Sequence, residues 1–358
     1  MGSMSHVAVI GAGPAGSVTA LLLARSGIDV TLIEQHRFPR DKVCGECLSA
    51  LGIDVLSRLC LAGDLQHLAP RSLRRVVIFP PDARSIELAL PRPMLGISRR
   101  ALDQFLLQAA RDAGARILQP ARCESLTPLR LRTFDENCTR TLHADLIVLA
   151  NGKGQPSGDF GLKAHFIGIN APPDAIGLFG VQGHYGGVAP VEADRWNLAF
   201  SVPAARIRQY ARYFDRLLDA IMRENGQLGR WMAGARRVSD WLVSPLPRFD
   251  VRDDWPDRVI PVGNAAAAIE PIGGEGIGLA IRSAELAAAA ILAAPQGDHR
   301  VDLHRLKSEY RKLWGWRGLV CRCAAMAISN PPLASFLAQS IAPGDPITAS
   351  VLRAIGKV

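Results

Sequence analysis

The chain has 358 residues, of which 48% are hydrophobic and 21% charged, a composition that is typical of globular proteins and excludes a disordered one. Its formal net charge of +9 allows nucleic acid, an anionic membrane surface or an acidic protein as a partner. The chain contains no nucleic-acid-binding module and no apolar run of about 18 residues, so we expect neither nucleic acid binding nor a transmembrane segment. The length suffices for one large core or for two domains that share an interface.

The first predicted element is an apolar strand at residues 7–10, followed by a glycine-rich turn and a helix-like run. Gly11, Gly13 and Gly16 have the spacing of the dinucleotide-binding fingerprint. Its glycines permit a tight turn, close approach to a pyrophosphate and close packing of helix on strand. A second strand then ends at Glu34, whose carboxylate suits ribose hydroxyls. The stretch therefore predicts a dinucleotide at the N-terminus of the first helix.

A charged loop follows at residues 35–46, and it brings Cys44 into C-x-x-C spacing with Cys47. Such a pair can be redox active, or the thiols can simply pack as small apolar groups. We expect no metal site, because the other close pair, at residues 321–323, has no set of histidines nearby. Since the first strand leaves no room for a signal peptide, we expect a cytoplasmic protein with reduced thiols.

Strand-like runs at residues 73–79 and 85–90 predict a hairpin that belongs to a different sheet from the first strands. Ser98 is placed to cap a helix over residues 99–113. A continuous apolar run at residues 144–150 then predicts a buried parallel strand.

Residues 163–203 are β-rich and punctuated by glycine, which predicts a second sheet that covers the ligand. An amphipathic helix is expected over residues 206–224. The strand at residues 259–262 returns to the first domain, and an alanine-rich helix follows at 278–294. Residues 303–340 are expected to be mostly helical, with a break at two prolines.

Three segments occur in a familiar order. The fingerprint with Glu34 comes first, residues 144–152 occupy the place of a short Asp-Gly motif, and residues 262–278 look like a Gly-Asp…Pro…Gly-x-Gly motif. Together they resemble the FAD-dependent monooxygenase superfamily, which has the para-hydroxybenzoate hydroxylase fold. Lys-Val-Cys-Gly-Glu at residues 42–46 and Gly-Glu-Gly at 274–276 are most similar to geranylgeranyl-reductase-type flavoproteins.

The resemblance implies an α/β fold with a Rossmann-like, glutathione-reductase-like FAD-binding domain, an inserted antiparallel-sheet substrate domain and a helical C-terminal tail. It assigns the FAD-binding domain to residues 1–70, 96–158 and 250–296. The substrate domain takes 71–95 and 159–249, and the C-terminal helical segment takes 297–358.

The resemblance also implies FAD as the cofactor and NAD(P)H as the electron donor. The residues that it and the fingerprint assign to the cofactor are Gly11, Ala12, Gly13, Pro14, Ala15, Gly16, Glu34, Gln35, Lys42, Cys44, Arg99, Cys123, Gly263, Asn264, Pro271, Gly274, Gly276 and Ile277. Two positions depart from the family pattern, because Asn151 and Asn264 stand where an aspartate is usual. Asn264 keeps the acceptor oxygen, whereas the change at Asn151 weakens the expectation that NADPH binds directly.

Function divides into several readings. We expect an FAD-dependent oxidoreductase, in first place a monooxygenase that hydroxylates an aromatic or polyketide-like substrate in biosynthesis. A geranylgeranyl-reductase-like reductase or dehydrogenase acting on C=C bonds is the alternative, and a flavoprotein that modifies a carrier-bound or protein-bound substrate is another. Flavin halogenases share Gly45-Glu46, but their tryptophan-rich motif is absent and no lysine lies between Lys42 and Lys153, so halogenation is not expected.

The flavin would carry the chemistry, so the catalytic side chains stay open. His184 and Tyr185 are candidates on a predicted strand of the second sheet, or they simply pack there. Cys44 is a candidate proton donor or an apolar filler, and the tryptophans at 314 and 316 are expected to anchor the core.

We expect the substrate to be a hydrophobic or aromatic small molecule, which an acidic carrier protein could present. The arginine-rich region at residues 71–100 is the candidate docking surface for that carrier. A plain solvated basic face explains the same charge, which also allows peripheral membrane contact.

Overall fold

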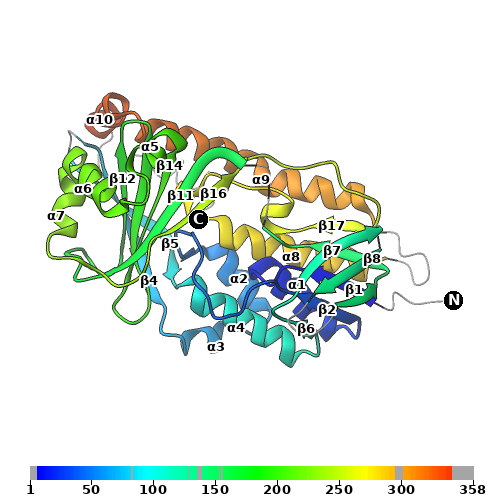
Figure 1. The fold of residues 1–358 in the computed structure, drawn as a ribbon. Coiled ribbons are helices and arrows are strands. Elements are labelled where there is room, and N and C mark those ends of the chain that lie inside the picture. The colour runs from blue at the N-terminus through cyan, green and yellow to red at the C-terminus, as the bar shows by residue number, and fades with distance from the viewer. Residues whose placement is uncertain are drawn as a thin grey trace.

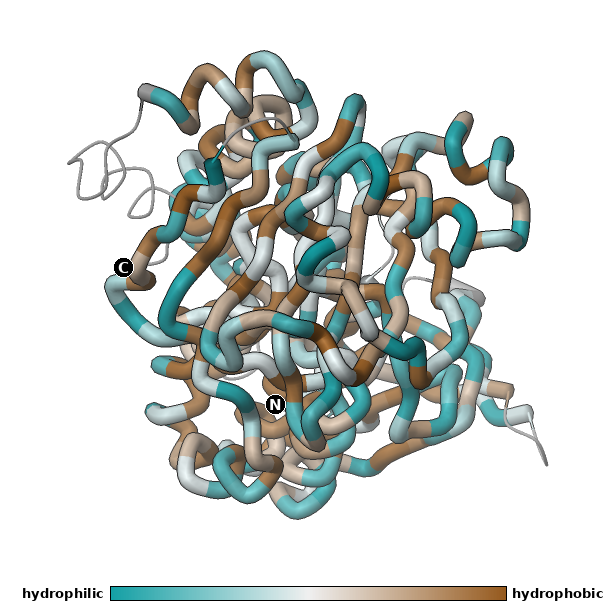
Figure 2. The backbone as a smooth tube through the Cα atoms, turned by 90° about the vertical axis from the view of Figure 1, so that its left-hand side faces the viewer, coloured by the Kyte–Doolittle hydropathy of each residue, from teal (hydrophilic) through white to brown (hydrophobic). Residues whose placement is uncertain are grey.

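The computed structural model describes residues 6–81, 84–127, 129–134, 139–152, 154, 156–294 and 301–340. Two sheets lie at opposite ends of the molecule, with helices between and around them (Figure 1). One sheet is parallel and the other is mixed, so the protein has an α/β fold. In Figure 2, hydrophobic and hydrophilic residues are interleaved along the outer helices, as expected for elements that pack one face on a core.

The parallel sheet has the strand order β17-β10-β1-β2-β6. Its strands are β1 (His6–Ile10), β2 (Asp29–Ile33), β6 (Arg116–Leu118), β10 (Leu146–Leu149) and β17 (Val259–Pro261). Alternate residues of β1 face opposite layers, since Val7 and Val9 pack with the helices while Ala8 packs beneath a small sheet. The helices on the first face are α1 (Pro14–Arg25), α4 (Arg99–Asp112) and α8 (Gly276–Leu292). The small antiparallel sheet on the second face consists of β7 (Arg122–Thr127), β8 (Arg130–Phe134) and β9 (Thr139–His143).

The second sheet has the order β15-β11-β14-β13-β12-β4-β5-β3, and β16 pairs with β11 beside that path. Its pairs are antiparallel except for β4 with β12. Its strands are β3 (Cys47–Leu48), β4 (Arg71–Phe79), β5 (Ile86–Gly96), β11 (Pro156–Ile167), β12 (Ala175–Val181), β13 (His184–Pro190), β14 (Trp196–Pro203), β15 (Arg236–Arg237) and β16 (Leu242–Pro247). One face packs against α6 and α7, and the other turns toward the parallel sheet.

Other helices connect the two sheets or pack across them. They are α2 (Ala50–Arg58), α3 (Ala62–Gln66), α5 (Ala204–Tyr210), α6 (Phe214–Glu224), α7 (Gly226–Met232), α9 (Leu303–Ile328), α10 (Pro331–Ser340) and the 3-10 turns η1 (Gly263–Ala265) and η2 (Pro271–Gly273). Helix α9 runs along one edge of the molecule, from α8 to the second sheet, where α10 follows it (Figure 1).

Several local predictions are confirmed. The hairpin forms as β4 and β5 within the second sheet, and Ser98 accepts a hydrogen bond from Ala101 N at the start of α4. Two predictions are wrong in detail. The expected helix over 206–224 is two helices, broken near Ala211, whose φ is +47°. The sequence also predicts a helix-like run from Leu48 to about Leu61, but Leu48 instead ends the two-residue strand β3, which pairs with β5. The expected C-terminal helical segment forms α9 and α10, and residues 341–358 lie outside the described residues.

Candidate functional site

A cavity of about 290 Å³ lies between the parallel sheet and the second sheet. The first of its walls is formed by glycine-rich turns at the ends of parallel strands, and the second by side chains of β11 to β14. The loop before β3 contributes the third wall, where Lys42 and Cys44 reach the cavity. A concave site that joins two sheets and mixes apolar lining with few polar groups has the general character of a ligand pocket.

Two helix N-termini meet at the first wall. Helix α1 begins at Pro14 and α8 begins at Gly276, and both residues line the cavity. Free main-chain N–H groups and the positive end of the helix dipole make such ends suitable for anions. A Cβ atom added at Gly276 would meet no atom within 4 Å, so the open cavity continues up to the main chain there.

The structure brings together most residues assigned to the cofactor. Those that line the cavity are Gly13, Pro14, Ala15, Lys42, Cys44, Arg99, Gly263, Asn264, Pro271, Gly274, Gly276 and Ile277. Those outside its lining are Gly11, Ala12, Gly16, Glu34, Gln35 and Cys123. Gly11 and Gly16 have a packing role, because a Cβ at Gly16 would lie 1.8 Å from the Gly11 carbonyl oxygen.

Glu34 holds the fingerprint turn in place. Its side chain is buried, and its two carboxylate oxygens accept hydrogen bonds from Ala12 N and His36 N, both at 2.9 Å. Gln35 beside it is exposed. The Glu34 carbonyl accepts from Ala121 N, one residue before the strand that carries Cys123. Gln35 and the strand that carries Cys123 therefore lie beside the end of β2. A ribose contact from Glu34 stays a prediction.

Arg99 and Asp103 form a buried ion pair at the base of the cavity. The Arg99 guanidinium donates two hydrogen bonds to the Asp103 carboxylate, at 2.7 and 2.6 Å. Burial alone would lower the pKa of Arg99, but the Asp103 charge and hydrogen bonds more than offset this, and the pKa is raised. Lys42 has no such carboxylate bonded to it. Burial, helped by the nearby Arg99 charge, lowers its pKa to about 8.

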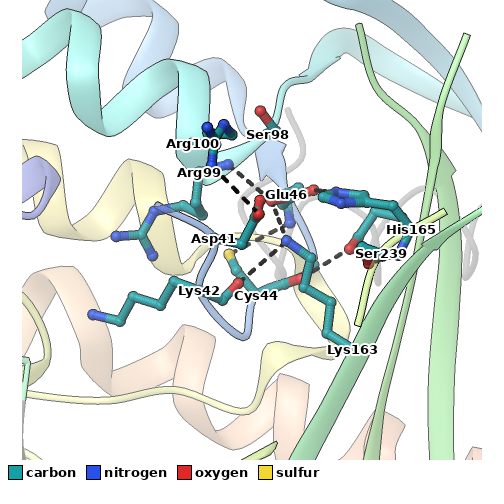
Figure 3. A network of polar contacts seen from close by, with 12 residues as sticks. Asp41, Lys42, Cys44, Glu46, Ser98, Arg99, Arg100, Lys163, His165 and Ser239 are labelled. Atoms are coloured by element: carbon teal, nitrogen blue, oxygen red, sulfur yellow. Dashed lines mark hydrogen bonds and ion pairs between the residues drawn. The ribbon is translucent and has the colours of Figure 1, made fainter. Parts of the chain in front are cut away.

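Glu46 is the centre of a buried polar network at the same loop (Figure 3). Lys163 donates to one carboxylate oxygen of Glu46, and His165 Nε2 lies 2.7 Å from the other. The Arg99 main-chain N–H also donates to Glu46, at 2.8 Å. Burial would raise the pKa of Glu46, but the His165 hydrogen bond and the Lys163 charge outweigh it, so this pKa is lowered. Glu46 is therefore a buried carboxylate that is held in its charged form.

The network connects the loop before β3 and the start of α4 to strand β11 across a long sequence separation. Lys163 and His165 belong to β11, and Lys163 also donates to the Lys42 carbonyl at 3.3 Å. Asp41 lies nearby, with a potential ligand atom within 4.8 Å of those of Glu46 and His165. Lys163 already occupies one Glu46 oxygen, so the cation beside this carboxylate is supplied by the chain itself.

The sequence analysis missed Lys163 and His165. A signal was present, because two polar residues at i and i+2 in a strand share one face, while Leu162, Ala164 and Phe166 occupy the other. That pattern in a buried strand indicates a polar interaction across the sheet face. It does not identify the partner, Glu46, which lies 117 residues away.

The two candidates on β13 point in opposite directions. Tyr185 lines the cavity and donates a 2.6 Å hydrogen bond to Glu270. Burial raises the pKa of Tyr185 well above its usual value, and burial also raises the pKa of Glu270. His184 is buried outside the cavity lining, and burial together with the Arg206 charge lowers its pKa to about 4. Of these two candidates, Tyr185 is therefore the one placed to meet a ligand.

The comparisons with known proteins agree with this geometry. Residues 4–165 match the FAD binding domain family. This part of the chain is therefore similar to an FAD binding domain. The resemblance to FAD-dependent monooxygenases and geranylgeranyl-reductase-type flavoproteins is thereby confirmed. Menaquinone reductase from Mycolicibacterium smegmatis is 24% identical over 80% of this chain and 76% of its own length. Chloroplastic geranylgeranyl diphosphate reductase from Oryza sativa is 24% identical over 97% of this chain and 84% of its own.

Solved structures share the fold. The flavin-dependent brominase Bmp2 superposes with a TM-score of 0.80 at 19% identity, over 99% of this chain and 94% of its own. A geranylgeranyl bacteriochlorophyll reductase-like protein from Thermoplasma acidophilum gives 0.75 at 19% identity, over 99% and 96%. Among the described residues, no helix is both long enough and apolar enough to cross a bilayer.

The residues present fit FAD. Helix α1 offers its N-terminus to a pyrophosphate, and Arg99 and Lys42 add positive charge at the same cavity. Helix α8 offers a second N-terminus to the negative charge that a flavin ring gains on reduction. The open space at Gly276 and the main-chain lining at Gly263 and Gly274 leave room for a flat ring to approach closely.

Proposed function

We propose that this FAD-dependent oxidoreductase is a reductase that saturates a C=C bond in a hydrophobic, isoprenoid-like substrate. The observation that carries the proposal is a mostly apolar cavity whose lining includes the Cys44 thiol and the Tyr185 hydroxyl, two groups that can donate protons. Reduction of a C=C bond needs a hydride on one carbon and a proton on the other. Bound FAD supplies the hydride, and the chain must supply the proton.

The apolar wall favours a substrate with little polarity. Its members are Leu162, Ile176, Leu178, Val188, Phe200, Leu246, Phe249 and Ile272. Burying such side chains against a prenyl-type chain contributes about 25 cal/mol of binding free energy per Å² of apolar surface, and this contribution needs no hydrogen-bond geometry.

Cys44 is the proposed proton donor. The Glu46 N–H donates to its sulfur at 3.4 Å, and the Arg99 guanidinium lies beside it. A thiolate left after proton transfer would be stabilised by the hydrogen bond from this N–H and by the charge of the guanidinium. Tyr185 would orient the substrate, since its hydroxyl is already bonded to Glu270.

The relatives supply further support for reduction. Proteins named as reductases match 79% to 97% of this chain, whereas squalene monooxygenase from Rattus norvegicus matches 46% of it, at 26% identity. The second candidate is the aromatic or polyketide-like hydroxylation expected at first, which the same cavity would accommodate. Bromination, the reaction in the name of Bmp2, is not proposed, since at 19% identity that likeness extends to the fold alone.

The test begins with purified holoenzyme whose flavin is released and identified. We propose NAD(P)H as the electron donor, so the bound flavin is reduced anaerobically with NADH or NADPH and then mixed with a prenylated quinone or a polyprenyl diphosphate. A product heavier by two hydrogens supports the reductase. A product that gains oxygen only after O2 is admitted supports hydroxylation and overturns it.

The variant Cys44→Ser tests the proton donor. We expect kcat to fall about 100-fold with flavin content unchanged, because serine is a far weaker acid. The control is Cys60→Ser, since Cys60 is exposed and far from the cavity lining. If kcat of Cys44→Ser matches that of the control, another group delivers the proton.

A further inference from the structure

Helix α9 carries an exposed apolar stripe on the side that faces solvent. Trp316, Leu319, Cys323 and Met326 follow one another at helical spacing, so they share one face. Trp316 is 64% exposed and Met326 67% exposed. The expectation that Trp316 anchors the core is therefore wrong, whereas Trp314, two positions earlier, is buried.

Helix α10, which follows α9, also exposes apolar side chains. It packs against α9, and its Leu333 and Phe336 are also exposed, Phe336 to 64%. We call these residues the α9–α10 stripe, which consists of Trp316, Leu319, Cys323, Met326, Leu333 and Phe336. Large apolar side chains gathered at one surface indicate an interaction site rather than scattered exposure.

The segment that carries the stripe is rich in basic residues, although Arg311 pairs with Asp253 and Lys312 pairs with Glu309. From residue 310 to residue 340 the sequence has four basic residues, Arg311, Lys312, Arg317 and Arg322, and no acidic one. Arg317 and Arg322 donate to the main-chain carbonyls of Leu313 and Phe249. The stripe is thus an apolar face bordered by positive charge on a chain whose net charge is +9.

The opposite face of α9 packs behind the wall of the cavity. Its buried residues include Trp314, Cys321 and Ile328, and the helix packs against β13 and η2. Cys321 lies close enough to Tyr185 to contribute to the raised pKa of its hydroxyl, and Tyr185 lines the cavity. A single helix therefore separates the exposed stripe from the cavity wall.

We propose that the α9–α10 stripe is a docking surface for an anionic lipid bilayer. Helix α9 would lie in the plane of the membrane, with its apolar side chains among the acyl chains and its basic residues at the headgroups. An amphipathic helix with basic borders and exposed tryptophan, leucine and phenylalanine has the chemistry for this interfacial position. Docking itself is independent of the reaction. That the cavity then receives a substrate dissolved in the bilayer rests on the proposed reductase function.

A second copy of the chain fits the stripe less well. In a two-fold dimer the same patch meets itself, so Arg317 and Arg322, which donate to main-chain carbonyls, would meet the same positive charges of the second copy. Like charges brought together at an interface oppose association, whereas anionic headgroups would neutralise them.

The experiment is co-sedimentation of the full-length holoenzyme with phosphatidylglycerol–phosphatidylcholine vesicles. The test variant is Trp316→Ser/Leu319→Ser/Met326→Ser, and the control is Tyr213→Ser, which removes another aromatic ring that is 54% exposed. We expect the holoenzyme and the control to bind, more weakly at high salt and on pure phosphatidylcholine. The triple variant should bind at least about tenfold more weakly, since apolar burial is lost.

Flavin content and thermal unfolding show that the variants are folded, and the intrinsic fluorescence of Trp316 gives an independent signal. Brominated lipids should quench holoenzyme fluorescence in excess of the quenching seen for Trp316→Phe. Absence of vesicle binding by the holoenzyme overturns the proposal. So does binding that appears only after residues 341–358 are deleted, or a dimer that the triple variant abolishes in sedimentation.

Activity separates this proposal from the proposed function. The triple variant should reduce a short-chain, water-soluble substrate at the holoenzyme rate and lose turnover only with substrate in vesicles. Vesicle binding without turnover of any C=C substrate would leave the docking surface in place and reject the reductase.

Discussion

The two main walls of the cavity are built on opposite principles. The wall at the ends of the parallel strands presents main chain, through Gly13, Gly263, Gly274 and Gly276. The wall on the second sheet presents side chains, among them Tyr185, Leu178 and Phe200. Main-chain recognition tolerates little change and suits a constant ligand such as FAD, whereas side chains can be exchanged to suit different substrates. Variants on the two walls should therefore fail in different ways.

The largest effect is expected where the two walls are joined. Glu46→Leu leaves Lys163 buried without its carboxylate, and we expect the free energy of unfolding to fall by about 3–5 kcal/mol. Chemical denaturation of the flavin-bound protein measures this. Adding Lys163→Met should restore part of the stability, because it removes the unpaired charge. If the double variant is as unstable as the single one, the ion pair is not the cause.

On the main-chain wall, Gly16→Ala should cost about 3 kcal/mol and empty the protein of flavin, since the new methyl group would overlap the Gly11 carbonyl. The flavin-to-protein absorbance ratio after purification measures the loss. Gly63→Ala is the matched control, because its Cβ would meet nothing within 4 Å. Full flavin content in Gly16→Ala would show that the turn relaxes easily.

On the side-chain wall, Tyr185→Phe should leave flavin content unchanged and lower kcat/KM about tenfold. The ring remains, but the hydroxyl bonded to Glu270 is lost. Steady-state kinetics with the accepted substrate measure it. His184→Gln on the same strand should have a smaller effect on kcat/KM, because His184 lies outside the cavity lining. Equal losses in both variants would mean that packing of β13, rather than the hydroxyl, matters.

The smallest effect concerns Lys42, on the loop between the walls. Because its pKa is about 8, its charge is lost as the pH rises from 7 to 9, and flavin affinity should fall about fivefold, which corresponds to the loss of one ion pair worth about 1 kcal/mol. Flavin titration into the apoprotein tests this. Lys42→Met should bind more weakly at pH 7 and show no such change. The same pKa makes the unfolded chain retain the proton between pH 8 and 10.5, so this group's contribution to stability rises with pH across that window.

Much of the first wall could be predicted from sequence because its determinants are local. One strand–turn–helix–strand unit contains Gly11, Gly13, Gly16 and Glu34. Three glycines at this spacing, between a strand and a helix, are typical of a dinucleotide-binding turn. The β4–β5 hairpin and the α4 cap were predictable for the same reason.

The second wall and the network could not be predicted in this way. Lys163 and Glu46, like Tyr185 and Glu270, meet only through the tertiary fold, and one sequence contains no signal that pairs them. Alternation along β13 indicates that His184 and Tyr185 face opposite sides, but not which side holds the cavity. The exposed side of α9 was likewise undetermined, so Trp314 and Trp316 were assigned the same role although only Trp314 is buried.

The chain enters the second sheet twice, first through β3 to β5 and again from β11 to β16, before β17 and α8 complete the parallel layer. As a consequence, a growing polypeptide cannot assemble the flavin pocket until its residues beyond Ile277 have emerged from the ribosome. Fragments that stop earlier would expose both half-built walls to chaperones and proteases. The amount of protein-bound flavin, measured by its absorbance, would then report the fraction of chains that have finished folding.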